Sequence, residues 1–128
     1  MNARNRAGRI LVAIGSIVLF ISAALHFVGG YSSGFPALAA SNLKLGLQAA
    51  FRAVFLSLGW DWILLGIIAL AATFKASAAR KALVLVCGFG VLIEAVVGAA
   101  IMGVFLGNEM IGTAAVLIIV GGLLFDRV

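Results

Sequence analysis

Four long runs of apolar residues, separated by short polar stretches, dominate this chain of 128 residues. We expect them to form helices at about 10–28, 53–74, 82–106 and 110–125. The hydrocarbon core of a bilayer is about 30 Å thick, and a helix needs about 20 mostly apolar residues to cross it. The pattern therefore predicts an all-α, integral membrane four-helix bundle that forms a single transmembrane domain over 1–128.

The first apolar run follows a cluster of arginines, a pattern that signal peptides share. The run is longer than the apolar part of a signal peptide, and no small-residue cleavage site follows it, so we expect a retained helix. Gly29-Gly30 are expected to end this helix. The next stretch, 31–41, contains the only proline, Pro36, and is predicted to be an ordered loop at the membrane interface.

The second run begins ambiguously, because nothing between 42 and 74 breaks a helix. One continuous helix over 42–74 would be about 50 Å long, which exceeds the thickness of the bilayer. Either that helix projects beyond the outer surface, or 42–57 forms a separate, short amphipathic helix at the interface. Lys44, Gln48 and Arg52 recur every four residues and form one polar stripe, which is compatible with both alternatives.

The composition supports the membrane class and excludes others. The chain is 65% hydrophobic and 10% charged, with a mean hydropathy of +1.28, whereas a soluble domain is usually about half apolar and a quarter charged. The net charge is +5, but no basic stripe is interleaved with aromatic residues, so we expect no nucleic acid partner. Cys87 is the only cysteine and is expected to be a small buried apolar residue.

The positions of the basic residues predict the orientation of the bundle. Lys and Arg gather at the amino end, between the second and third helices, and at the carboxyl end: Arg4, Arg6, Arg9, Lys75, Arg80, Lys81 and Arg127. The first connection carries Lys44 and Arg52, and the third carries none. Because cytoplasmic loops are enriched in Lys and Arg, we expect both termini in the cytoplasm. The expected location is a plasma (inner) membrane of bacterial type, with the lipid bilayer as the main partner.

Glycines suggest where the helices approach one another. Gly59 and Gly66 are seven residues apart and share one helical face, and Gly103 and Gly107 form a G-x-x-x-G pattern near the expected end of the third helix. Small residues let the backbones of membrane helices approach closely. The pattern is compatible with internal packing and with the interface of a homo-oligomer or of a larger membrane complex.

Three ionisable residues fall within the predicted spans: His26, Asp61 and Glu94. Counted from the nearest basic residue at a rise of 1.5 Å per residue, they lie about 20–25 Å from the inner edge of the membrane. This common depth predicts one polar pocket in the outer half of the bundle. Thr113, near the start of the fourth predicted helix, lies at about the same depth. Charged residues within a membrane are costly and usually functional, so we take these residues, with Gln48 and Arg52, as candidate ligand-binding residues.

Several chemistries are open to this set. One histidine and two carboxylates could hold a divalent metal, relay protons or bind a cationic solute, so the cofactor and the metal remain unknown. Alternatively, His26 reaches lipid headgroups and Asp61 marks the water boundary between two tryptophans. Arg52 lies about 180° around the helix from Asp61, so the two cannot share a face. We expect Arg52 to meet Glu109, Asn108 or a lipid phosphate instead.

One local resemblance accompanies these patterns. His26-Phe27 followed by Gly29-Gly30 resembles the end of the first helix of DoxX-like proteins. The resemblance covers only a short stretch, and we assign the chain to no family.

Three functions follow from these patterns. The leading hypothesis is a small polytopic membrane protein that binds or translocates a small solute or ion, with Glu94 and Asp61 supplying negative charge and His26 a hydrogen-bond donor. In that hypothesis the first loop acts as a lid. The alternatives are an accessory subunit of a larger membrane complex and an intramembrane enzyme that acts on a lipid or quinone. The sequence contains no nucleophile or cofactor motif, so an enzyme is the least favoured of the three.

Overall fold

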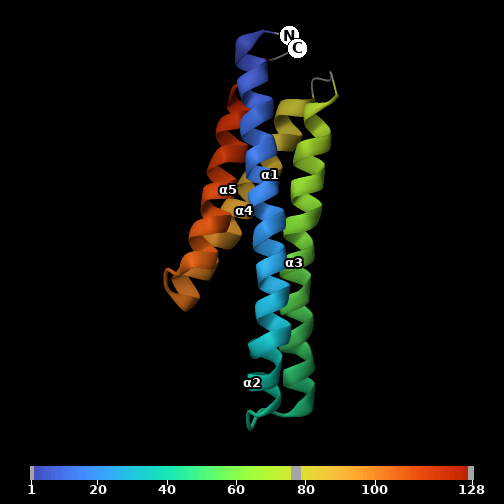
Figure 1. The fold of residues 1–128 in the computed structure, drawn as a ribbon, viewed down its shortest axis with the longest axis vertical. Helices are drawn as coiled ribbons and strands as arrows, with labels where there is room; N and C mark the ends of the chain where they lie inside the picture. The colour runs from blue at the N-terminus through green and yellow to red at the C-terminus, as the bar shows by residue number, and fades with distance from the viewer. Residues whose placement is uncertain (1, 76–78, 127–128) are drawn as a thin grey trace.

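The computed structural model describes residues 2–75 and 79–126, and all regular secondary structure in those ranges is helical (Figure 1). The elements are α1 (Ala3–Gly29), a π-helical stretch η1 (Gly30–Gly34), α2 (Phe35–Ala39), α3 (Leu45–Thr73), α4 (Ala79–Met102) and α5 (Leu106–Leu123). Four helical stretches are long and apolar enough to cross a membrane: Ala3–Ala39, Leu45–Thr73, Ala79–Met102 and Leu106–Leu123. The predicted all-α four-helix bundle is therefore confirmed.

The four long helices form a closed ring around one core. α1 packs against α3 and α5, and α4 packs against the same two helices from the other side. Branched side chains with no exposed surface fill the centre, among them Val12, Leu19, Val91 and Ile118. Both chain ends lie at the same end of the bundle as the connection between α3 and α4 (Figure 1). We call this the basic end, because Lys and Arg are concentrated there; Arg127 lies outside the described residues.

The outward faces of the helices are apolar, as contact with lipid requires. On α1, exposed aliphatic side chains recur every three or four residues along one face: Ile10, Ile14, Ile17, Ile21, Leu25 and Val28. Such a stripe facing outward would destabilise a protein surrounded by water. Together with the four spans, it identifies the chain as an integral membrane protein.

α1 ends at Gly29, where the sequence predicts the end of the first helix, but the backbone stays helical beyond it. Gly29 and Gly30 both have right-handed helical dihedral angles, and the helix continues through η1 into α2. A glycine ends a helix when it adopts the left-handed conformation, and neither does so here. Pro36 lies at the start of α2, where its missing N–H is not needed. The predicted interfacial loop over 31–41 is thus helical as far as Ala39, and 40–44 makes the turn.

The second run forms one helix, α3, which settles the alternative that the sequence left open. Its 29 residues correspond to about 43 Å, so it is longer than the hydrocarbon core. η1, α2 and the first turns of α3 reach beyond the tip of the α4–α5 hairpin (Figure 1). We call residues 30–54 the α1–α3 extension.

The turn between the third and fourth helices lies earlier than predicted. α4 ends at Met102, and Gly103 has a φ of +80°, the left-handed conformation that stops a helix. Phe105 is extended, so α5 begins at Leu106, and Gly107 and Asn108 lie in its first turn. The connection expected at 107–109, between the predicted helices 82–106 and 110–125, is therefore wrong. Gly103 and Gly107 therefore do not form a G-x-x-x-G helix-packing motif, because Gly103 lies outside both α4 and α5.

The other glycine prediction is confirmed for internal packing. Gly59 and Gly66 face α1 together: a Cβ at Gly59 would lie 2.6 Å from the Phe27 ring, and a Cβ at Gly66 would lie 2.7 Å from the Phe20 ring. The two glycines thus let aromatic side chains of α1 lie directly on the α3 backbone.

Candidate functional site

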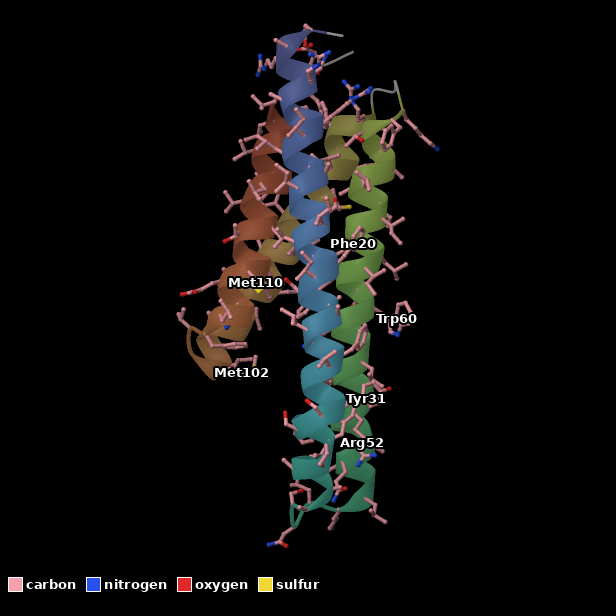
Figure 2. All side chains as sticks on the ribbon, in the orientation of Figure 1. Phe20, Tyr31, Arg52, Trp60, Met102 and Met110 are labelled. Carbon is pink, nitrogen blue, oxygen red and sulfur yellow. The ribbon has the colours of Figure 1, made fainter. Side chains whose placement is uncertain are left out.

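A cavity of about 280 Å³ lies in the half of the bundle away from the basic end. Its lining residues come from α1, α3, α4, α5 and the α4–α5 turn, and in this part of the fold the α4–α5 hairpin leans away from α1 and α3 (Figure 1). Its wall is mainly apolar and consists of Ser22, Leu25, His26, Leu58, Trp62, Glu94, Gly98, Met102, Phe105, Leu106, Gly107, Asn108, Met110 and Ile111. Figure 2 labels Met102 and Met110, the two methionines of this wall, on the α4–α5 hairpin.

The strongest polar contact in the wall joins α3 to α4. Trp62 Nε1 donates a hydrogen bond of 2.6 Å to Oε2 of Glu94. Trp62 is 8% exposed and lies on the core face of α3, three residues after Gly59 and four before Gly66. Glu94 is half-buried and precedes the core residue Ala95. Among the hydrogen bonds of the described residues, none uses the second oxygen of Glu94, which leaves it as an acceptor in the cavity wall.

His26 is held by a backbone contact that fixes its tautomer. Its Nε2 lies 2.8 Å from the carbonyl oxygen of Phe55. A carbonyl oxygen can only accept, so Nε2 carries the proton and, in the neutral ring, Nδ1 is an acceptor. The imidazole stacks on the Phe55 ring at a centroid distance of 3.6 Å and meets the Trp62 indole edge-on at 4.8 Å. His26, Trp62 and Glu94 thus line one wall.

Asn108 closes the end of the cavity next to the α4–α5 turn. It is 7% exposed, and its Nδ2 donates a hydrogen bond of 2.9 Å to the carbonyl oxygen of Gly103. Its Oδ1 lies against α4, 3.0 Å from where a Cβ of Gly98 would stand. Asn108 therefore fixes the turn and places an amide group in the wall.

The structure brings two of the six candidate residues into the cavity and places four elsewhere. His26 and Glu94 line the wall, whereas Asp61 and Thr113 are exposed side chains outside it. Arg52 is exposed, with its guanidinium carbon 5.7 Å from the centre of the Phe35 ring. Gln48 is buried, but its amide donates to the carbonyl oxygen of Leu43 at 2.9 Å and so closes the 40–44 turn.

These positions bear on the metal hypothesis. Within residues 2–75 and 79–126, no three His, Cys, Asp or Glu side chains lie close enough together to hold a metal ion. His26 and Glu94 share the cavity wall without a third such ligand.

Trp62 is a site residue that the sequence pattern did not single out, because both tryptophans were interpreted only as flanking Asp61 at the water boundary. Trp60 fits that assignment, since it is 58% exposed and points away from the bundle (Figure 2). Two helical residues two positions apart lie about 200° apart around the axis, so Trp62 has to face the opposite way. Its spacing from Gly59 and Gly66 was the signal that it faces the core.

Four apolar spans with lipid-exposed faces, enclosing a mainly apolar cavity with a few polar groups, define a polytopic integral membrane protein with a candidate small-molecule site. Comparisons with protein-family models, with curated proteins and with solved structures find no match to this chain.

Proposed function

We propose that this membrane protein binds a small amphiphilic cation in the cavity, with its apolar body between the helices and its cationic group at Glu94. The observation that carries this proposal is the Trp62–Glu94 hydrogen bond in the cavity wall, which orients a carboxylate and leaves one of its oxygens for a ligand. We place the protein in the plasma (inner) membrane with the basic end in the cytoplasm, following the distribution of Lys and Arg.

The apolar lining supports a ligand with a hydrophobic body. Leu25, Leu58 and Ile111 present aliphatic carbon to the cavity, and Met102 and Met110 add flexible thioether side chains. Methionine adapts its shape to different ligands better than branched residues do. The volume of about 280 Å³ lies at the lower end of the range for ligand pockets, so the ligand is small.

The polar groups support a cationic group on that ligand. An ammonium group near Glu94 would meet the free carboxylate oxygen and the face or edge of the Trp62 indole, and aromatic rings attract cations through their quadrupole. His26 Nδ1 provides a second acceptor from the same wall.

The packing favours binding over passage through the bundle. Between the cavity and the basic end the core is filled by fully buried side chains, including Leu19, Val84, Val91 and Ile118. Interiors packed in this way leave no continuous path for a solute. Of the two forms of the leading hypothesis, we therefore propose binding.

A fluorescence titration tests the proposal. In the Trp60→Phe background Trp62 is the only tryptophan, so its emission reports on the cavity. The probes are benzyltrimethylammonium and its neutral isostere neopentylbenzene, which differ only in the charged atom. Glu94→Gln should weaken binding of the ammonium about 10- to 100-fold, because it removes a charge-assisted contact, and should leave binding of the neutral probe unchanged.

Asp61→Asn is the matched control, since it removes an exposed carboxylate adjacent to Trp62 and outside the cavity. It should change the affinity for the ammonium far less than Glu94→Gln does and leave the affinity for the neutral probe within about twofold, because the Asp61 carboxylate lies outside the cavity wall. Equal affinity of the unsubstituted protein for the charged and neutral probes, or an equal effect of Asp61→Asn and Glu94→Gln, would contradict the proposal.

One observation favours a second candidate, an accessory subunit of a larger membrane complex. The α1–α3 extension reaches beyond the α4–α5 hairpin and exposes apolar side chains, with Leu45 83%, Phe51 56% and Val54 60% exposed. A partner that covers them would stabilise the extension. Native mass spectrometry of the unsubstituted chain and of the Phe51→Lys variant tests this. A bound partner of defined mass, or a second copy of the chain, that is present in the first spectrum and absent from the second supports a subunit. The enzyme alternative stays a prediction.

A further inference from the structure

Arg80 is a buried cation whose guanidinium is not fully satisfied. It is the second residue of α4 and is only 6% exposed. Its guanidinium carbon lies 4.5 Å from the centre of the Phe125 ring, which is itself completely buried. Its Nε is enclosed and has no hydrogen-bond partner. Stacking on the ring occupies one face of the guanidinium, and the N–H groups in its plane are the donors through which an acceptor would bind.

Arg9 presents a second unsatisfied guanidinium at the same end. It precedes the core residues Val12 and Ser16 at helical spacing and so lies on the core-facing side of α1. Its Nε is also buried without a hydrogen-bond partner. The Phe125 ring stacks under Arg80 and lies 3.2 Å from where a Cβ of Gly8, the residue before Arg9, would stand, so both arginines lie near the level of this ring.

Two other charged groups at the basic end, Asp126 and Lys81, have partners of their own. Asp126 is the one side-chain carboxylate at that end among the described residues, and it accepts hydrogen bonds of 2.8 Å from the side chains of Asn2 and Asn5. Lys81 donates to the carbonyl oxygens of Leu123 and Phe125 at 3.3 and 3.2 Å and so caps α5. Both of the Asp126 hydrogen bonds use its Oδ2, and the buried Nε atoms of Arg9 and Arg80 bind neither of its oxygens.

A buried cation needs an anionic partner, because desolvation without one is unfavourable. The location favours a phosphate group. Arg80 lies beside the amino end of α4, where the helix dipole is positive and attracts anions. The basic end is also where the bundle meets the headgroups of the membrane, and planar guanidinium groups match phosphate oxygens in paired hydrogen bonds.

We propose that Arg9 and Arg80 form a phosphate-binding site at the basic end of the bundle. The phosphate belongs either to the headgroup of an anionic phospholipid or to a soluble phosphate compound. The site is independent of the cavity at Glu94, which lies 14 residues further along α4, about 21 Å away.

Lipid retention and thermal unfolding test this site on the full-length chain. The protein in a neutral detergent is titrated with phosphatidylglycerol, with phosphatidylcholine and with inorganic phosphate, and bound lipid is counted by native mass spectrometry. We expect phosphatidylglycerol to bind and to raise Tm, and Arg80→Gln to weaken that binding about tenfold or more, as for loss of a charge-assisted contact. Arg9→Gln should act in the same direction.

Lys75→Gln is the matched control, because it removes one exposed positive charge from the same end. It should change the affinity less than about twofold, since exposed charges contribute little. Arg80→Lys keeps the positive charge but loses the planar guanidinium, so it should bind phosphatidylglycerol with intermediate affinity. This variant replaces Arg80→Gln in the test if Arg80→Gln does not fold. A response to inorganic phosphate as large as that to the lipid assigns the site to a soluble phosphate compound. The proposal is overturned if Lys75→Gln and Arg80→Gln lose equal amounts of affinity for phosphatidylglycerol, or if the protein retains phosphatidylcholine as well as phosphatidylglycerol.

Discussion

The indole of Trp62 and the carboxylate of Glu94 bridge two antiparallel neighbours in the bundle, with 2.6 Å between Nε1 and Oε2. Trp62 lies near the middle of α3, and Glu94 lies in the half of α4 that leads to the α4–α5 turn. The hydrogen bond thus joins α3 to α4 in the cavity wall.

This contact predicts a specific pattern of stability. Trp62→Phe removes the donor and leaves a half-buried carboxylate unsatisfied, so it should lower the free energy of unfolding by about 1–3 kcal/mol. Glu94→Leu should cost a similar amount, whereas Glu94→Gln keeps an acceptor oxygen and should cost clearly less. Thermal unfolding in one detergent, combined with the Trp62→Phe/Glu94→Leu double variant, measures the coupling. Trp60→Phe changes an exposed side chain, so its free energy of unfolding should lie within about 0.5 kcal/mol of that of the unsubstituted protein.

The contact between α1 and α5 predicts a steric effect. A Cβ at Gly8 would lie 2.7 Å from the carbonyl oxygen of Gly121, a backbone atom that cannot move away by itself. Gly8→Val should therefore force the helices apart and cost about 1–3 kcal/mol. Gly29→Val is the matched control, because nothing lies within 4 Å of its Cβ position and valine is a better helix former than glycine. Equal melting temperatures for the two variants would show that α1 and α5 do not cross this closely.

The α4–α5 turn predicts a backbone effect at one glycine. Gly103 has a φ of +80°, which costs a residue with a Cβ about 1–2 kcal/mol. Gly103→Ala should lower stability by that amount, and Gly103→Asn should lower it less, since asparagine tolerates the left-handed region. Gly46→Ala, in open space at the start of α3, should be neutral or stabilising. Thermal unfolding of the three variants checks the order, and a stable Gly103→Ala would place the turn elsewhere.

The number and approximate position of the spans were predictable, because hydropathy over 18 or more residues is a strong signal. The helix ends were not, since they depend on what each glycine does in three dimensions. Gly30 is helical, and a Cβ there would lie 2.5 Å from the Phe55 ring, so it is needed for close packing of α3. Gly103, with the same side chain, does stop a helix. Sequence alone does not distinguish these two uses of glycine.

The candidate site was predictable only in part, for a related reason. Depth along the helices identified His26 and Glu94, because an ionisable residue inside a long apolar run is conspicuous. Depth did not decide whether Asp61 or Trp62 faces the cavity, because adjacent residues of a helix lie at nearly the same depth and differ by about 100° around the helix axis. The answer depends on which face of α3 packs against α1. Gly59 and Gly66 lie on the same face as Trp62 and contact α1, so Trp62 is the residue that faces the core.

The single histidine offers a direct spectroscopic prediction. Because the carbonyl oxygen of Phe55 accepts from His26, the neutral ring should be the Nε2–H tautomer. Nitrogen-15 NMR of histidine-labelled protein in bilayers reports the tautomer without assignment, as the chain has one histidine. Benzyltrimethylammonium should shift the Nδ1 signal if the ligand meets this wall of the cavity. An Nδ1–H tautomer would contradict the hydrogen bond.

The orientation of the bundle can be tested with single cysteines in a Cys87→Ser background, because Cys87 is the only native cysteine and is buried. Asn2 lies at the basic end and Ser33 in the α1–α3 extension, and both are exposed. The excess of Lys and Arg at the basic end predicts that it faces the cytoplasm. In intact cells a membrane-impermeant maleimide should therefore label the Ser33→Cys variant and reach the Asn2→Cys variant only after permeabilisation. The reverse pattern would place the cavity mouth on the cytoplasmic side and would require a cytoplasmic source for its ligand.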